Sequence, residues 1–239
     1  MLTQPQTIQL HGMSTGNVDL WFGDSWPIGT ELGSPNDSID KSIYPNAKLG
    51  VDNPMLSFSQ HVSNHRQHPV INFARGGSSL DFALYSLMSF CKNTYDPSKT
   101  YTAFLCLSEQ ARGFGISGVL NKHFHFGRGS PKSKFDLYIY DSMIALNSFY
   151  LICNKYNIDL KIIPIFSNFD FPAILSNIQF IEEHNWVCHE SVTYLTFGEH
   201  MRDADGNMDF DKYWIRPNEM HANAVGHKII ADKIISLLT

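Results

Sequence analysis

The feature that most constrains the fold is an almost entirely apolar run in mid-chain, Thr102 to Leu107. Strands that are buried on both faces have this composition, and they occur in parallel sheets covered by helices on both sides. Further β-rich runs occur at 18–22, 70–73 and 161–166, and longer stretches with helical spacing separate them. This alternation is typical of βα units and predicts an α/β fold.

The predicted architecture is a three-layer α/β/α sandwich around a mostly parallel sheet of about five strands. Either Trp186-Val187 or the segment 192–197 supplies the short fifth strand. With 239 residues, 43% of them hydrophobic, the chain can bury a sizeable core. We therefore expect residues 1–239 to form a single domain.

Capping and spacing patterns place the helices. Asn53-Pro54 has the form of an N-cap followed by a first helical position, and Ser78 or Ser79 can cap the next helix. Long helices are predicted over 134–156 and 222–238. The intervening segments 33–52 and 112–133 are predicted to be long loops, and loops of that length in a compact domain are often functional.

Composition argues against several classes of protein. A net charge of −5 is unlike the basic surface of a nucleic-acid binder. No apolar run reaches the roughly 20 residues of a membrane span. Met1 to His11 lacks the pattern of a signal peptide, so a cytoplasmic location is expected, with a virion component as the alternative.

No cofactor or metal is expected either. There is no Gly-x-Gly-x-x-Gly or phosphate-binding loop. His123 and His125 lack a third ligand at a recognisable spacing, which argues against zinc. The four cysteines are isolated in the sequence and are predicted to be free thiols: Cys91, Cys106, Cys153 and Cys188.

A candidate nucleophile follows the first predicted strand. Gly23-Asp24-Ser25 begins where that strand ends, at the carboxyl edge of the sheet, where open α/β folds bind ligands. A serine needs a base before it can attack. His221, in a loop just before the last predicted helix, can supply it if that helix packs beside the first strand.

Four blocks in this order resemble the SGNH hydrolases of the GDSL esterase/lipase superfamily. The first is the Gly-Asp-Ser block, and the second is Asn72 to Gly77 after the second strand. The third is the segment 108–111 after the apolar strand. The last is the segment 218–227, which contains His221 and His227.

The resemblance implies a flavodoxin-like fold and assigns catalytic roles. Ser25 is the nucleophile and His221 its general base. The oxyanion hole comprises the N–H groups of Ser25 and Gly77, with Gly76 as the alternative glycine, and the side-chain amide of Gln110. His227 is implied to be a packing residue.

Two positions depart from the family pattern. Gln110 stands where the family has Asn, and Asn218 stands where an Asp orients the histidine. An Asn oxygen can accept the bond from Nδ1–H, as it does in papain-like proteases. Three orienting groups therefore remain open: Asn218, Glu219 or a backbone carbonyl.

The expected activity is hydrolysis of a small acyl ester, most simply an acetyl ester on a carbohydrate, through an acyl-enzyme. Candidate substrate-binding residues are Trp26, Arg75 and Arg112; the alternatives are packing for Trp26 and surface ion pairs for the arginines. A lipase or thioesterase is the alternative enzyme. The alternative outside enzymes is a degenerate hydrolase that binds a glycan or serves as a structural module in a larger assembly such as a phage particle. Nucleic-acid and membrane partners are not expected.

Overall fold

The computed structural model describes about seven tenths of the chain. The described residues are 16–34, 38–107, 112–114, 123–125, 132–165, 181–189, 191–193, 195–196, 203–205, 207, 209–213 and 221–238. For 112–114, 123–125, 132–142 and 210–211 the description covers the backbone alone.

The central sheet has the strand order β2-β1-β3-β6, and every neighbouring pair is parallel. Its strands are β1 (Asn17–Phe22), β2 (Val70–Asn72), β3 (Thr100–Leu107) and β6 (Ile158–Pro164). Because the strands are parallel, their carboxyl ends meet at one edge. The predicted α/β fold is confirmed, and the predicted apolar run forms most of β3, which is central in the sheet.

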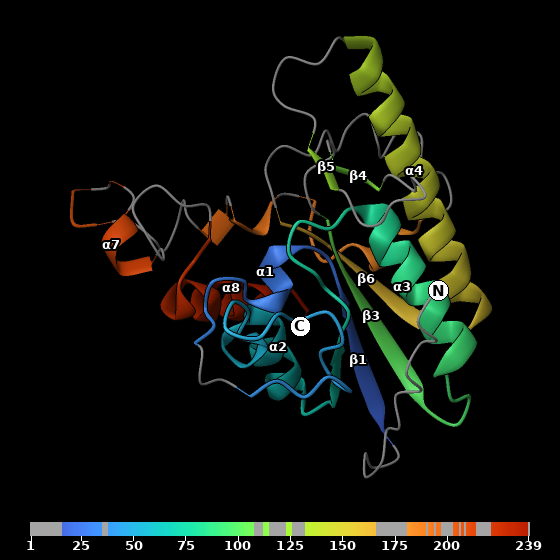
Figure 1. Ribbon diagram of the computed structural model, residues 1–239, viewed down its shortest axis with the longest axis horizontal. Helices are drawn as coiled ribbons and strands as arrows, with labels where there is room; N and C mark the ends of the chain where they lie inside the picture. The colour runs from blue at the N-terminus through green and yellow to red at the C-terminus, as the bar shows by residue number, and fades with distance from the viewer. Residues whose placement is uncertain are drawn as a thin grey trace.

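Helices cover both faces of this sheet (Figure 1). On one face lie α3 (Leu80–Asn93) and α4 (Lys132–Lys155), and on the other lie α2 (Phe58–Arg66) and α8 (Ala224–Leu238). Shorter helical elements include α1 (Ser25–Ile28), η1 (Pro54–Leu56), η2 (Glu183–Asn185) and α7 (Phe210–Tyr213).

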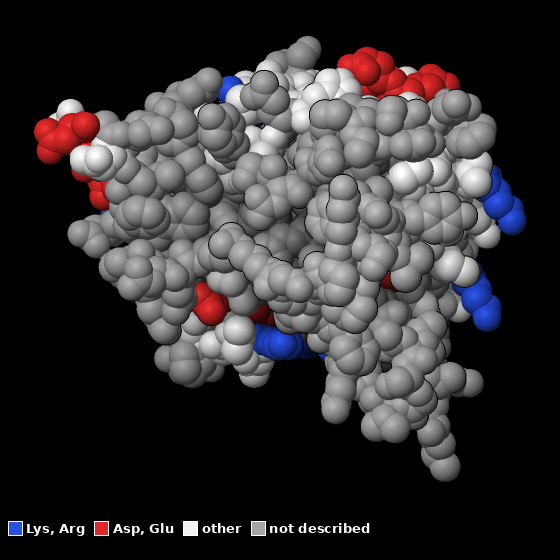
Figure 2. All heavy atoms as spheres, turned by 90° about the horizontal axis from the view of Figure 1, so that it is seen from above, with Lys and Arg blue, Asp and Glu red and all other residues white. Residues whose placement is uncertain are grey.

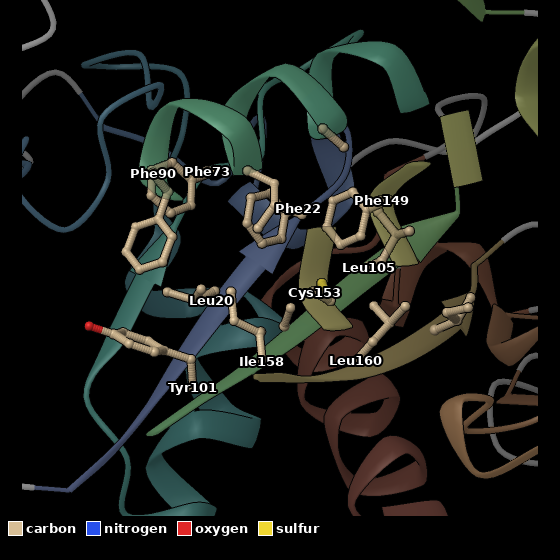
Figure 3. Packing of buried hydrophobic residues seen from close by; sticks show 14 of the residues in the cluster. Leu20, Phe22, Phe73, Phe90, Tyr101, Leu105, Phe149, Cys153, Ile158 and Leu160 are labelled. Carbon is tan, nitrogen blue, oxygen red and sulfur yellow. The ribbon is translucent and has the colours of Figure 1, made fainter. Parts of the chain in front are cut away.

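Alternate residues of each strand enter two separate cores. Leu20 and Phe22 of β1 face α3 and α4, where Phe22 stacks on Phe73 and meets Phe149 edge-on (Figure 3). Trp21 faces the opposite way, stacks on Phe104 and packs with α2 and α8. Period-two alternation with apolar residues on both faces is what a covered central strand requires.

The fifth strand is reduced to a single contact in the described chain. Trp186 forms one isolated parallel bridge with Ile162, and the N–H of Val187 donates to Ile162 O at 3.0 Å. The described residues of the alternative segment, 192–193 and 195–196, do not form a strand. Leu195 N–H donates to Ser191 O, and residues 192–193 and 195–196 are helical.

Two further sequence expectations need correction. The predicted loop 112–133 contains an antiparallel pair, β4 (Arg112–Phe114) with β5 (His123–His125), and α4 begins within it at Lys132. Asn53 and Pro54 are the N-cap and first position of a helix, as predicted, but this 3₁₀ helix, η1, ends at Leu56 and Ser57 caps α2. Ser79, one of the two predicted caps, does cap α3. Cys91, Cys106, Cys153 and Cys188 are all free thiols, as predicted.

Candidate active site

Gly23 makes the sharp turn that ends β1. Its φ of +147° lies in a region that side chains rarely adopt, and an added Cβ would lie 2.8 Å from Cys106 Cβ. Glycine is therefore required both by conformation and by the close approach of β3. Asp24 then caps α1, because its carboxylate accepts from the N–H of Trp26 at 3.1 Å. The chain thus leaves the sheet abruptly and places Ser25 in the first position of α1.

Ser25 and His221 meet across almost the whole length of the chain. Ser25 Oγ lies 2.8 Å from His221 Nε2, although 196 positions separate the two residues. This is the hydrogen-bond distance expected of a nucleophile and its base. The carboxyl end of β1 and the segment before α8 therefore form the pair that the sequence predicted.

The N-cap of α8 holds His221 in place. The Asn223 side chain accepts from the N–H groups of Val225 and Gly226, both at 3.0 Å, while Asn223 N–H donates to Tyr213 O at 2.9 Å. His221 is two residues before this cap, and the cap is tied to α7 by the bond from Asn223 N–H to Tyr213 O. Its side chain keeps 22% exposure, so the ring is accessible from solvent.

The other ring nitrogen of His221 faces a carboxylate that the sequence did not predict. His221 Nδ1 lies 3.4 Å from Glu31 Oε2, within ion-pair range. Glu31 lies between the first two blocks and outside every motif of the family pattern. The missing Asp at position 218 was the available signal, because it calls for an acidic residue elsewhere near the site.

The second block forms a turn beside Ser25. Gly23 O accepts both from the Ser78 hydroxyl at 2.6 Å and from the N–H of Arg75 at 3.1 Å, which ties the two blocks together. The turn closes through Ser78 N–H to Arg75 O, with Gly77 at φ +73°. An added Cβ on Gly76 would lie 4.0 Å from Ser25 Cβ. Both candidate oxyanion glycines therefore belong to a turn held against Ser25.

The side chain of Asn72 links the second block to α1 and α2. It is fully buried, and its amide donates to Pro27 O at 2.7 Å and to Ser59 Oγ at 3.0 Å. Its carbonyl oxygen accepts from Ala74 N–H at 3.0 Å. The amide thus joins the end of β2 to α1 and α2, and it fixes the position of the turn relative to Ser25.

Known structures share this fold at low sequence identity. The chain is similar to a carbohydrate esterase reported to have divergent catalytic and non-catalytic binding functions (TM-score 0.53, 11% identity, 93% of this chain and 68% of that chain). It is also similar to the acetyl xylan esterase Est2A from the rumen bacterium Butyrivibrio proteoclasticus (TM-score 0.52, 11% identity, 93% and 63%).

A third similar structure is a Corynascus thermopiles carbohydrate esterase family 2 enzyme with a carbohydrate-binding domain (TM-score 0.50, 11% identity, 95% and 67%). The chain thus spans about two thirds of the length of these neighbours. No protein-family model and no curated protein matches the sequence. The fold is that of carbohydrate esterases.

Trp26 and His227 lie next to the hydrogen-bonded pair of Ser25 and His221. Trp26 is 2% exposed, and its ring centroid is 6.1 Å from that of His221 and 6.0 Å from that of His227. This burial favours packing over a substrate contact for Trp26. His227 accepts from Phe58 N–H through Nδ1 at 3.2 Å. Burial, reinforced by the neighbouring His221 and His61, lowers the pKa of His227 to about 3.

The remaining predicted site residues are described to different extents. The guanidinium of Arg75 lies 5.4 Å from the centroid of the Phe82 ring, beside the glycine turn. Arg112 is described in its backbone alone, as the first residue of β4. Gln110, Asn218 and Glu219 lie outside the described residues, and their predicted roles remain predictions.

The described residues contain neither a metal-ligand cluster nor a helix suited to crossing a membrane. In Figure 2, described Lys and Arg side chains form small groups near the periphery, with no continuous basic surface among them. The described residues contain no group of three or more His, Cys, Asp or Glu that could hold a metal ion. Nor does any described helix combine the length and apolar character needed to cross a bilayer.

Proposed function

We propose that the protein is a serine esterase that removes a small acyl group, such as acetyl, from a carbohydrate. The observation that carries the proposal is the 2.8 Å contact between Ser25 Oγ and His221 Nε2. The shared fold with carbohydrate esterases supports the substrate class. That part of the proposal is an analogy, because one fold can support many activities.

The chemistry follows from the geometry of the pair. Ser25 Oγ attacks the ester carbonyl carbon while His221 Nε2 accepts the hydroxyl proton. The tetrahedral intermediate collapses when His221 returns this proton to the leaving alcohol, which gives an acyl-enzyme on Ser25. Water, deprotonated by His221, then attacks the acyl carbon, and the carboxylic acid leaves as Ser25 regains its proton.

The oxyanion is stabilised by backbone donors at the sheet edge. The N–H of Ser25 and an N–H of the Gly76-Gly77 turn are the proposed donors, with Gln110 as a side-chain donor. A single oxyanion donor contributes about 3–4 kcal/mol to the transition state in a well-studied serine protease. The rigid tie between Gly23 O and the second block keeps these donors fixed relative to Ser25.

The test compares the wild type with Ser25→Ala on p-nitrophenyl acetate and on acetylated oligosaccharides. We expect the wild type to release acetate and the variant to lose at least 10³-fold in kcat. A series of p-nitrophenyl esters of increasing acyl length tests the lipase alternative, and we expect activity to fall with length. Equal rates for wild type and Ser25→Ala, with glycan binding retained, would instead support the binding module.

A further inference from the structure

We propose that Glu31 is the positioning residue of His221, and that it supplies the carboxylate missing from position 218. This inference rests on the proposed esterase function and deepens it. It places the third member of the triad in the loop after α1, between the first and second blocks.

The two ring nitrogens of His221 face different partners. Nε2 is 2.8 Å from Ser25 Oγ, and Nδ1 is 3.4 Å from Glu31 Oε2. A carboxylate at Nδ1 favours the tautomer that carries the proton there. Nε2 is then the unprotonated nitrogen, which is what a base acting on Ser25 requires.

The distance is long for a hydrogen bond but suits a resting site. N–H···O bonds in proteins are commonly 2.7–3.2 Å. Catalytic hydrogen bonds are often longer without substrate and tighten in the Michaelis or transition-state complex. Once His221 takes the proton of Ser25, its imidazolium is attracted to the Glu31 carboxylate more strongly than the neutral ring was.

The backbone around Glu31 is fixed on both sides. Thr30 N–H donates to Ser25 O at 3.0 Å, and Gly33 N–H donates to Val51 O at 3.0 Å. The Thr30 hydroxyl also donates to Asp52 at 2.8 Å, and Asp52 is buried. Glu31 therefore lies in a short segment bound to α1 at one end and to the loop before η1 at the other.

Glu31 also has an unusual backbone conformation. Its φ is +69°, in the left-handed region that few residues other than glycine adopt. Apart from glycine, Asn, Asp and His are the residues most enriched in this region, and Glu is not among them. Residues held in such conformations cluster at functional sites. Here the conformation coincides with a carboxylate directed at the catalytic histidine.

The sequence supports the assignment independently of the distance. The last block carries Asn218 where the family pattern has an acidic residue. A neutral amide can orient an imidazole, but it stabilises the imidazolium less than a carboxylate does. A carboxylate at Glu31 meets that electrostatic need from another part of the chain.

The experiment compares Glu31→Gln and Glu31→Asp with the wild type, with Glu183→Gln as a matched control. Glu183 is the first residue of η2, outside the site, and it forms an ion pair with His189. For Glu31→Gln we expect kcat on p-nitrophenyl acetate to fall about 100-fold with little change in KM. This is less than the roughly 10⁴-fold effect of Asp→Asn in a serine-protease triad, because the Glu31 side chain is 37% exposed.

The pH profile separates positioning from a merely structural role. Without the carboxylate the imidazolium is less favoured, so His221 loses its proton at lower pH. The acidic limb of kcat/KM should therefore move to lower pH in Glu31→Gln. Glu31→Asp should retain the wild-type limb and recover part of kcat, and Glu183→Gln should match the wild type in both.

The failures of the two proposals are distinguishable. If the wild type hydrolyses esters and a fluorophosphonate labels Ser25, while Glu31→Gln keeps kcat and the wild-type acidic limb, Glu31 does not position His221. If the wild type neither hydrolyses esters nor reacts with the fluorophosphonate, the esterase function itself is wrong. Should Glu31→Gln fail to fold, Glu31→Asp decides: a partly reduced kcat with the wild-type acidic limb supports the inference, and a kcat equal to that of Glu183→Gln overturns it.

Discussion

Buried His227 makes the stability of this protein depend on pH. The side chain is 1% exposed, its ring stacks on Phe58 at a centroid distance of 5.7 Å, and its Nδ1 accepts from Phe58 N–H. Protonation would place a charge in the core and remove that acceptor. The cause of the low pKa, about 3, is mainly burial, with repulsion from His221 and His61 added.

The direction and size of the effect follow from linkage. Above pH 6.5 the histidine is neutral in both the folded and the unfolded chain, so its contribution to stability is fully present. Between pH 6.5 and about 3 the unfolded chain binds a proton that the folded chain does not, and stability falls by about 1.4 kcal/mol per pH unit. Between pH 7 and pH 5 the expected loss from this one group is about 2 kcal/mol.

The measurement is urea unfolding of the wild type, His227→Gln and His65→Gln at pH 7 and pH 5. Glutamine keeps an acceptor for the Phe58 amide but cannot titrate, so His227→Gln should lose about 2 kcal/mol less than the wild type on acidification. His65 is exposed on α2, and its variant should follow the wild type. Equal pH dependence in the wild type and His227→Gln would refute the argument that burial excludes the proton.

Two substitutions test the supports of the site, and one tests its nucleophile. Gly23→Ala should lower the free energy of unfolding in urea by about 1–3 kcal/mol, because the new Cβ would lie 2.8 Å from Cys106 Cβ. A variant as stable as the wild type would contradict this. Asn72→Ala should cost about 1–3 kcal/mol, because the hydrogen bonds of the buried amide to Pro27 O, Ser59 Oγ and Ala74 N–H are lost, and unchanged stability would argue against that role. Ser25→Ala should keep the wild-type unfolding midpoint to within a few degrees in a thermal scan while losing esterase activity; a large drop in the midpoint would show that the hydroxyl is needed for folding.

The sequence was most informative about the sheet, because burial on both faces leaves a local pattern. The apolar composition of Thr102 to Leu107 was sufficient to predict a covered central strand. The fifth strand was predicted less well, because Trp186 and Val187 have strand-like residues but make only one bridge beside β6. Local composition does not specify how long a strand remains in register with its neighbour.

The sequence predicted the site residues that lie in motifs, but it did not predict the one that only the fold brings to the site. Motifs of the sequence contain Ser25, the glycine turn and His221. The distance between Ser25 Oγ and His221 Nε2 agrees with the predicted pairing. Glu31 carries none, because its proximity to His221 depends on the path of the loop after α1 and on backbone bonds to Asn53 and Val51. Its role could be inferred only once the chain was placed in space.

Trapping of the acyl-enzyme tests most directly whether His221 activates Ser25 as the nucleophile. The protein is mixed with p-nitrophenyl acetate, quenched in acid within milliseconds to seconds, and digested for peptide mass spectrometry. We expect a mass increase of one acetyl group on the peptide containing Ser25, absent in Ser25→Ala and strongly reduced in His221→Ala. Ester turnover with no acetyl group on Ser25, or with acetylation unaffected by His221→Ala, would contradict the claim that His221 activates Ser25 as the nucleophile.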